Sequence, residues 1–235
     1  MHGVYSATIP TLPAPDLFAK LLPYVNEDRR DKVNRFWRHE DAWRSLLAEA
    51  LTRAAVISAT GNCNAMLSLS RDGQGKPSII GGDGSFLSIS HSGNLVVCAF
   101  DTHPIGIDVE EIVPVGEESA AVVLSPVEQK TILPAVHTGN LASFFKLWTM
   151  KESYAKVSGS GHQIAFDSFS LHDNQDTYSI LHSGGRRENA YFQHLPITEG
   201  YCCCVCSLTN TLELPLHFFA VEDIAETLMM AEQHG

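Results

Sequence analysis

The sequence predicts an α+β fold of two structurally similar halves, related by a pseudo-twofold axis. We expect each half to pack one long helix on a small, mostly antiparallel sheet. Helical periodicity covers residues 27–57 and 141–158, and each helical region precedes a run of short strands. Strands and helices do not alternate strictly, which disfavours a doubly wound sheet. Hydrophobic residues make up 44% of the 235 residues, enough to form a core in each half.

The predicted halves are residues 1–110 and 111–235. They share an order of elements but no residue-level identity, so the similarity is one of topology. If the halves are alike, the groove between them is the natural place for a ligand.

The first half begins with residues 1–25, where four prolines indicate a short strand and an extended lead-in. We expect two helices over residues 27–57, because a single helix of about thirty residues without an internal cap is long. Turn residues then separate short strands at residues 65–70, 86–90, 95–100 and 105–109. The turn Ser92-Gly93-Asn94 predicts a hairpin between the second and third of them.

In the second half, the pattern predicts helices at residues 126–135 and 141–158, strands at 166–171, 178–181, 190–194, 201–208 and 217–221, and a last helix at 224–232. Four cysteines crowd into the strand at 201–208. Cys203 and Cys206 have a spacing found in zinc sites, but no second ligand pair stands at suitable spacing. We interpret these cysteines as small hydrophobic residues of a buried strand.

The charge distribution is uneven. The chain has 16 Lys and Arg against 27 Asp and Glu, a net charge of −11, which argues against nucleic acid as a partner. Residues 29–44 nevertheless carry a net charge of +3, from six basic and three acidic side chains. This contrast predicts a local anion site, although a solvated helix face is the commoner reason for such a pattern.

The N-terminus lacks the basic and apolar segments of a signal peptide, and no apolar run approaches the ~18 residues of a membrane span. We therefore expect a cytoplasmic protein without a membrane partner.

Two carboxylates stand two residues apart in the predicted strand at 105–109. Asp108 and Glu110 then share one face, while Ile107 and Val109 face the core. A hard divalent cation such as Mg²⁺ relieves the repulsion between such carboxylates. A solvent-facing acidic strand is the alternative.

The helix at 141–158 brings Trp148, Glu152 and Lys156 onto one stripe. Glu152 could supply a third carboxylate for the metal, and Lys156 a cation that stabilises charge on a transferring phosphate. A simple ion pair within the helix is the alternative.

Ser90 and His91 end a predicted strand beside a glycine turn, and Lys76 lies on a turn framed by glycine and proline. Both places could bind phosphate oxygens, or could be ordinary surface turns. Together with the carboxylates, they suit a multiply phosphorylated substrate that is bound through Mg²⁺ and partly transferred.

Three segments resemble the 4′-phosphopantetheinyl transferases of the surfactin-synthetase-activating type. They are Gly-Lys-Pro followed by Ile-Ser-His-Ser at 75–77 and 89–92, Gly-Ile-Asp-Val-Glu at 106–110, and Trp-Thr-Met-Lys-Glu-Ser-Tyr-Ala-Lys at 148–156. The resemblance covers most of residues 25–210.

The resemblance implies a monomer with coenzyme A in the groove between the halves. The phosphopantetheine arm would pass to a serine of an acyl or peptidyl carrier protein, which releases adenosine 3′,5′-bisphosphate. The carrier could belong to a nonribosomal peptide, polyketide or fatty-acid synthase, and the type favours antibiotic and other secondary metabolism. Two alternatives stay open: a coenzyme A or nucleotide-binding module without turnover, and an unrelated Mg²⁺-dependent phosphohydrolase.

The resemblance also assigns roles to residues. Asp108, Glu110 and Glu152 would hold Mg²⁺ on the pyrophosphate of the coenzyme. Glu152 would take the serine proton, directly or through a metal-bound water, and Lys156 would offset charge on the leaving phosphate. The expected coenzyme contacts are Arg29, Lys32, Ser45, Ser90 and His91 around the 3′-phosphate, and Gly73, Lys76 and Pro77 by the adenine. Arg29 stands where relatives often carry lysine, which keeps the charge but changes its geometry.

Overall fold

The structure, a computed structural model, describes residues 2–10, 14–71, 77–80, 85–159, 164–175, 177–209 and 212–232. The structure contains both helices and strands, and most neighbouring strands are antiparallel, which confirms the predicted α+β class. Within the described ranges, none of the helices has the combination of length and apolar character that crossing a membrane requires.

The chain divides into two compact units that differ from the predicted halves. The first contains Met1–Thr102 and Leu214–Gly235, and the second contains His103–Glu213. Strand pairing explains the difference from the predicted boundary after residue 110. Strand β6 (Ile105–Glu111) pairs with β10 (Tyr201–Ser207) of the second unit, whereas β11 (Leu216–Phe219) returns to pair with β1 (Gly3–Thr8) of the first.

The sheet of the first unit has the order β11-β1-β5-β4. Strand β11 runs parallel to β1, and the other neighbours are antiparallel. The predicted hairpin is confirmed by β4 (Phe86–Ser92) and β5 (Leu95–Asp101), since Gly93 takes the positive φ of 52° that its turn needs. A separate two-stranded ribbon joins β2 (Ser68–Arg71) to β3 (Pro77–Ile80). The strand predicted at 65–70 is confirmed over its second half by β2, whereas β3 was not predicted.

The helices of the first unit are α1 (Pro15–Leu21), α2 (Glu27–Val33), α3 (His39–Thr60) and α7 (Val221–Glu232), with short 3-10 turns η1 (Leu22–Tyr24) and η2 (Asn64–Met66). The two helices predicted over residues 27–57 are confirmed. The extended structure predicted for residues 1–25 is wrong at residues 15–21, which form α1. Pro15 stands in the first turn of this helix, where its missing N–H costs little, and Leu21 anchors the helix by burial.

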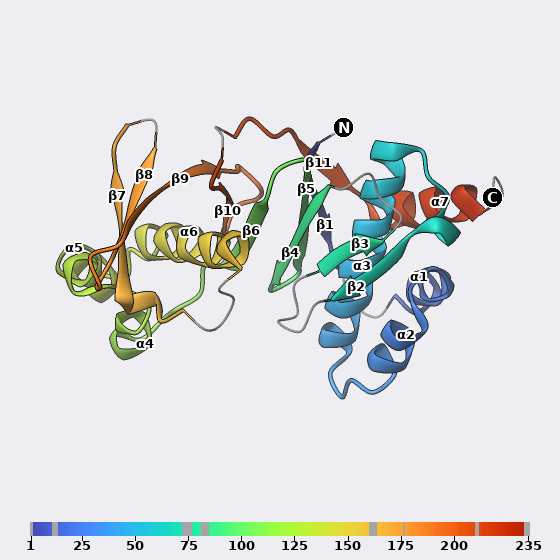
Figure 1. The fold of residues 1–235 in the computed structure, drawn as a ribbon. Helices are drawn as coiled ribbons and strands as arrows, with labels where there is room; N and C mark the ends of the chain where they lie inside the picture. Colours follow the sequence, from blue (N-terminus) through green and yellow to red (C-terminus); the bar gives the residue numbers. More distant parts are fainter. Residues whose placement is uncertain are drawn as a thin grey trace. The chain divides into compact units, whose positions relative to one another are not determined.

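Helix α3 is the centre of the first unit. Almost every residue from Ala42 to Ile57 is buried, as expected for a helix that is covered on all sides. It contacts β5 and β1, and also α1, α2 and α7 (Figure 1). The charged residues among those buried positions need internal partners, which matters for the site described below.

The second unit has an antiparallel sheet in the order β6-β10-β9-β8-β7. Its remaining strands are β7 (Phe169–Asp173), β8 (Tyr178–His182) and β9 (Arg187–His194), and its helices are α4 (Glu117–Ala121), α5 (Pro126–His137), α6 (Ala142–Ser158) and the 3-10 turn η4 (Phe166–Ser168). Helix α4 escaped prediction because five residues are too few to show periodicity. Residues 166–168 were predicted as strand but form η4.

The cysteine-rich segment is strand β10, as predicted. Cys203, Cys204 and Cys206 are buried, and all six cysteines are free thiols. Burial raises the pKa of the Cys204 thiol well above its usual value, which keeps it protonated. These thiols therefore serve as small hydrophobic side chains.

Candidate functional site

In the second unit, helix α6 lies directly on strand β6. A Cβ atom at Gly106 would stand 2.0 Å from the carbonyl oxygen of Ser153 and 2.8 Å from the backbone nitrogen of Val157. Only glycine permits this close approach of the helix backbone. Because side chains alternate along a strand, Asp108 and Glu110 lie on the same face as Gly106, the face that α6 covers.

Lys156 of α6 reaches Asp108 of β6. Its Nζ lies 2.6 Å from Asp108 Oδ1 and donates to the carbonyl of Ile107 at 2.9 Å. The side chain of Asp108 is 4% exposed and that of Lys156 is 27% exposed, so water is excluded mainly on the carboxylate side of the pair. A charge-assisted hydrogen bond in such a place is stronger than one at the surface.

Glu152 lies one helical turn before Lys156 on α6 and is half-buried. The three predicted metal ligands thus come from two elements in contact, β6 and α6. Their carboxylate oxygens are the donors that Mg²⁺ prefers, and Mg²⁺ needs only one or two of them besides water and phosphate. Across the parts of the chain that the structure describes, no three His, Cys, Asp or Glu side chains form a group able to hold a metal ion as they stand. Mg²⁺ stays a prediction based on donor chemistry.

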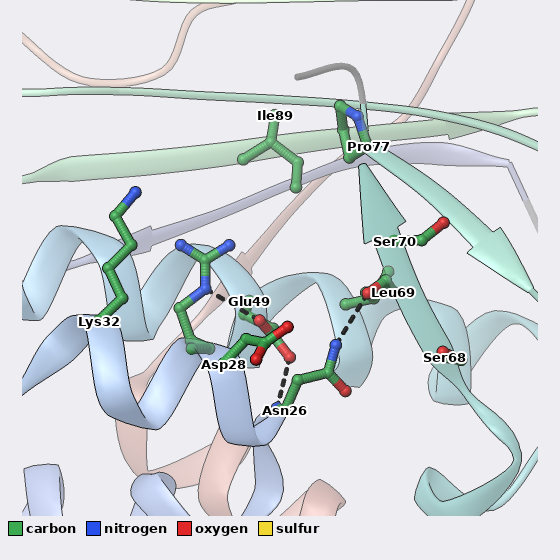
Figure 2. A pocket seen from close by; sticks show the side chains of 10 residues that line it. Asn26, Asp28, Lys32, Glu49, Ser68, Leu69, Ser70, Pro77 and Ile89 are labelled. Atoms are coloured by element: carbon green, nitrogen blue, oxygen red, sulfur yellow. Dashed lines mark hydrogen bonds and ion pairs between the residues drawn. The ribbon is translucent and has the colours of Figure 1, made fainter. Parts of the chain in front are cut away.

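The first unit contains a pocket of about 650 Å³. Figure 2 shows Asp28, Asn26 and Glu49 on one side of it, with Pro77 and Ile89 on the opposite side. The residues that line the pocket are Asn26, Asp28, Arg29, Lys32, Glu49, Ser68, Leu69, Ser70, Pro77 and Ile89. Three predicted coenzyme contacts are therefore among its walls: Arg29, Lys32 and Pro77.

Ser45 of α3 is buried next to this pocket and accepts a hydrogen bond of 2.8 Å from Arg29 Nη1. Ser90 and His91 lie on β4 immediately after Ile89. The alternation along β4 puts exposed His91 on the same face as Ile89, and buried Ser90 on the other face. Neither Ser90 nor His91 is among the residues that line the pocket, so the coenzyme contacts predicted for them stay predictions. Gly73 and Lys76 lie outside the described residues.

Two buried charged residues near these sites were not singled out from the sequence. Glu49 lies in the pocket wall, and Lys151 is fully buried on α6 beside Glu152. For Glu49 a signal did exist: it stands in an otherwise apolar stretch of helix, with the opposite charge of Arg53 four residues later.

Comparisons with known proteins agree with the motifs. Residues 104–206 match the family model of the 4′-phosphopantetheinyl transferase superfamily, and residues 12–103 match that of the N-terminal part of 4′-phosphopantetheinyl transferases. The 4′-phosphopantetheinyl transferase Sfp of Bacillus subtilis (strain 168) is 32% identical over 188 residues, which are 80% of this chain and 84% of the relative. The 4′-phosphopantetheinyl transferase gsp of Aneurinibacillus migulanus is 33% identical over 196 residues, 83% of this chain and 81% of the relative.

Together the two family models cover residues 12–206, which contain all the motif segments. The alignments with the two relatives cover 80% and 83% of the chain. The chain therefore belongs to the 4′-phosphopantetheinyl transferase family, in the group that resembles the surfactin-synthetase-activating enzymes.

Proposed function

We propose that this protein transfers the 4′-phosphopantetheine arm of coenzyme A to a serine of an acyl or peptidyl carrier protein, with Mg²⁺, and releases adenosine 3′,5′-bisphosphate. The observation that carries the proposal is the pairing of the two motif segments. The Asp-x-Glu strand and the Lys-Glu-x-x-x-Lys helix pack backbone to backbone at Gly106, and Lys156 binds Asp108.

The proposed reaction is a phosphoryl transfer. The serine Oγ bonds to the phosphorus that carries pantetheine, and the bond from that phosphorus to the bridging oxygen of the pyrophosphate breaks. Adenosine 3′,5′-bisphosphate leaves with the bridging oxygen. The serine proton passes to Glu152, directly or through a water molecule.

Asp108, Glu110 and Glu152 would hold the metal. When bound, Mg²⁺ would neutralise charge on the pyrophosphate oxygens. Lys156 would place its ammonium near the same oxygens as negative charge moves onto the leaving group. The ion pair with Asp108 fixes the position of that ammonium before substrate arrives.

The pocket of the first unit suits the 3′-phosphate and the adenine of the coenzyme. Arg29 and Lys32 offer two positive charges to a phosphate monoester, and Pro77 and Ile89 offer an apolar wall to the adenine. We assign the 3′-phosphate to this pocket, with His91 and Ser45 nearby.

The two units also share a plan, which supports the proposed likeness of the halves. One long helix, α3 or α6, packs on neighbouring antiparallel strands in each. Their sheets differ in strand number and order. A cytoplasmic location and a monomeric state stay predictions.

The test is intact-mass spectrometry of apo-carrier domains after incubation with the purified protein, coenzyme A and Mg²⁺. We expect the mass of one phosphopantetheine to be added, and no addition to a carrier in which the acceptor serine is alanine. A panel of peptide-, polyketide- and fatty-acid-synthase carriers would also identify the preferred class.

Two outcomes would contradict the proposal. Coenzyme A binding without modification of any carrier would favour a binding module. Phosphate release in the absence of a carrier would favour a Mg²⁺-dependent phosphohydrolase.

A further inference from the structure

A buried ionic network lies behind the pocket of the first unit. Its centre is Glu49 of α3, whose side chain is 4% exposed. Oε2 accepts from Arg29 Nε at 2.9 Å, and Oε1 accepts from Arg53 Nε at 3.1 Å and from the backbone N–H of Asn26 at 2.8 Å. Both carboxylate oxygens are therefore engaged, and Glu49 is held in one orientation.

Arg53 fixes the far side of this network. It is 3% exposed and donates to Asn26 Oδ1 at 2.5 Å, to Asn64 Oδ1 at 3.0 Å and to the carbonyl of Leu67 at 3.1 Å. Asn26 in turn donates to the carbonyl of Leu69 in β2, as Figure 2 shows. The network thus joins α3 to the start of α2 and to β2, three elements that form the pocket wall.

Arg29 is the member of the network whose guanidinium can contact a ligand in the pocket. Its Nε is bound to Glu49 and one Nη1 hydrogen to Ser45, which together fix the plane of the guanidinium. Within the described chain, Nη2 makes no hydrogen bond. The guanidinium therefore still has N–H groups at its Nη2 end that can donate into the pocket. A planar guanidinium with such groups can bind two oxygens of one phosphate.

The charged side chains around the pocket also favour the binding of a phosphate. Glu49 alone would repel an anion in the pocket, but the buried guanidinium of Arg53 balances its charge from behind. Arg29 and Lys32 then face the pocket against exposed Asp28. The carboxylate can therefore orient Arg29 without cancelling the attraction of the pocket for a phosphate monoester.

We propose that Glu49 is a positioning residue that, backed by Arg53, aims Arg29 at the 3′-phosphate and so sets the preference for coenzyme A over its 3′-dephospho form. This inference rests on the proposed function. It adds a residue that makes no contact with the reacting atoms and acts only through Arg29.

The first test is calorimetric binding of adenosine 3′,5′-bisphosphate and adenosine 5′-monophosphate to the full chain. For Glu49→Gln, which keeps the size of the side chain, we expect the affinity for the bisphosphate to fall about tenfold, as for loss of one charge-assisted contact, with the monophosphate unchanged. The control is Glu188→Gln, which changes a partly buried, ion-paired glutamate of the second unit and should alter neither affinity.

The second test asks whether Glu49 acts through Arg29. Arg29→Ala and Glu49→Gln are combined, and affinity for the bisphosphate is measured for each single and for the double variant. A positioning role predicts that Glu49→Gln has almost no further effect once Arg29 is absent. In the transfer assay, Glu49→Gln should raise KM for coenzyme A and leave kcat nearly unchanged.

The outcomes separate this inference from the proposed function. Equal losses of affinity for both nucleotides, or fully additive effects in the double variant, would overturn the positioning role and leave a purely structural one. If the wild-type protein modifies no carrier, the proposed function fails. The calorimetric comparison still decides the role of Glu49, because a wild type that does not prefer the bisphosphate over the monophosphate also overturns it.

Discussion

The ammonium of Lys156 lies 2.6 Å from Oδ1 of Asp108 and so connects helix α6 to strand β6 where the two motif segments meet. Each residue would have a separate task in the proposed reaction, one at the metal and one at the leaving phosphate. Their contact also means that a change in either removes the partner of the other.

Asp108→Asn should reduce kcat/KM for carrier modification about 10²-fold or more, because a neutral amide is a poor Mg²⁺ ligand and a weaker partner for Lys156. The circular dichroism spectrum should stay unchanged. Glu199→Gln, at an exposed position, is the control and should keep full activity. Activity of Asp108→Asn within a few-fold of wild type would refute the metal role.

Lys156→Met should lower kcat more than it raises KM for coenzyme A, since the ammonium is assigned to the developing charge rather than to binding. Steady-state kinetics at saturating carrier measures the split. Lys146→Met changes an exposed lysine of the same helix and should leave both constants unaltered. An increase in KM alone would assign Lys156 to coenzyme binding.

Gly106→Ala should destabilise the protein by about 1–3 kcal/mol or more, because the new methyl group would collide with the backbone of α6 rather than with a movable side chain. Urea unfolding measures the loss. At Gly184 an added Cβ would meet nothing within 4 Å, so Gly184→Ala should change stability little. Equal stability of the two variants would contradict the packing argument.

Lys151→Met should lower the free energy of unfolding by about 3–5 kcal/mol, because it leaves the carboxylate of Glu128 buried without its cation. Lys151 is fully buried, lies 2.5 Å from Glu128 Oε2 and donates to the carbonyls of Val123, Phe166 and Phe169. Burial lowers the pKa of this lysine, and Glu128 opposes that shift. The double variant with Glu128→Gln should lose less than the sum of the single losses, and strict additivity would argue against the pair.

His194 should make stability depend on acid pH. Burial, with a smaller contribution from Lys146, lowers its pKa from 6.5 to about 4. The unfolded chain binds a proton as the pH falls below 6.5, whereas the folded chain does so only near 4, so the free energy of unfolding decreases across this window. The difference in unfolding free energy between wild type and His194→Gln, followed from pH 7 to 4, should show this decrease. A constant difference would contradict it.

Local signals predicted much of this fold. Ser92-Gly93-Asn94 marks the hairpin of β4 and β5 because a turn with positive φ has few alternatives. The order of the motif segments likewise predicted that Asp108 and Lys156 belong to one site. These features depend on residues close together in the chain or on a family pattern.

Long-range pairing was not predictable in the same way. No residue close to Glu49 in the sequence predicts its contact with the backbone of Asn26, which stands 23 residues earlier. Helix α1 was obscured by prolines that elsewhere interrupt helices, although Pro15 occupies the position where proline is tolerated.

The pairing of β1 with β11 has a consequence for biosynthesis. Strand β1 is made among the first residues of this chain, but its parallel neighbour leaves the ribosome only after the whole of the second unit. Until those residues are synthesised, β1 lacks its neighbour β11 at one edge of the sheet, and α3 lacks its contact with α7. In the growing chain, the residues of the second unit are therefore all present before those of the first unit are.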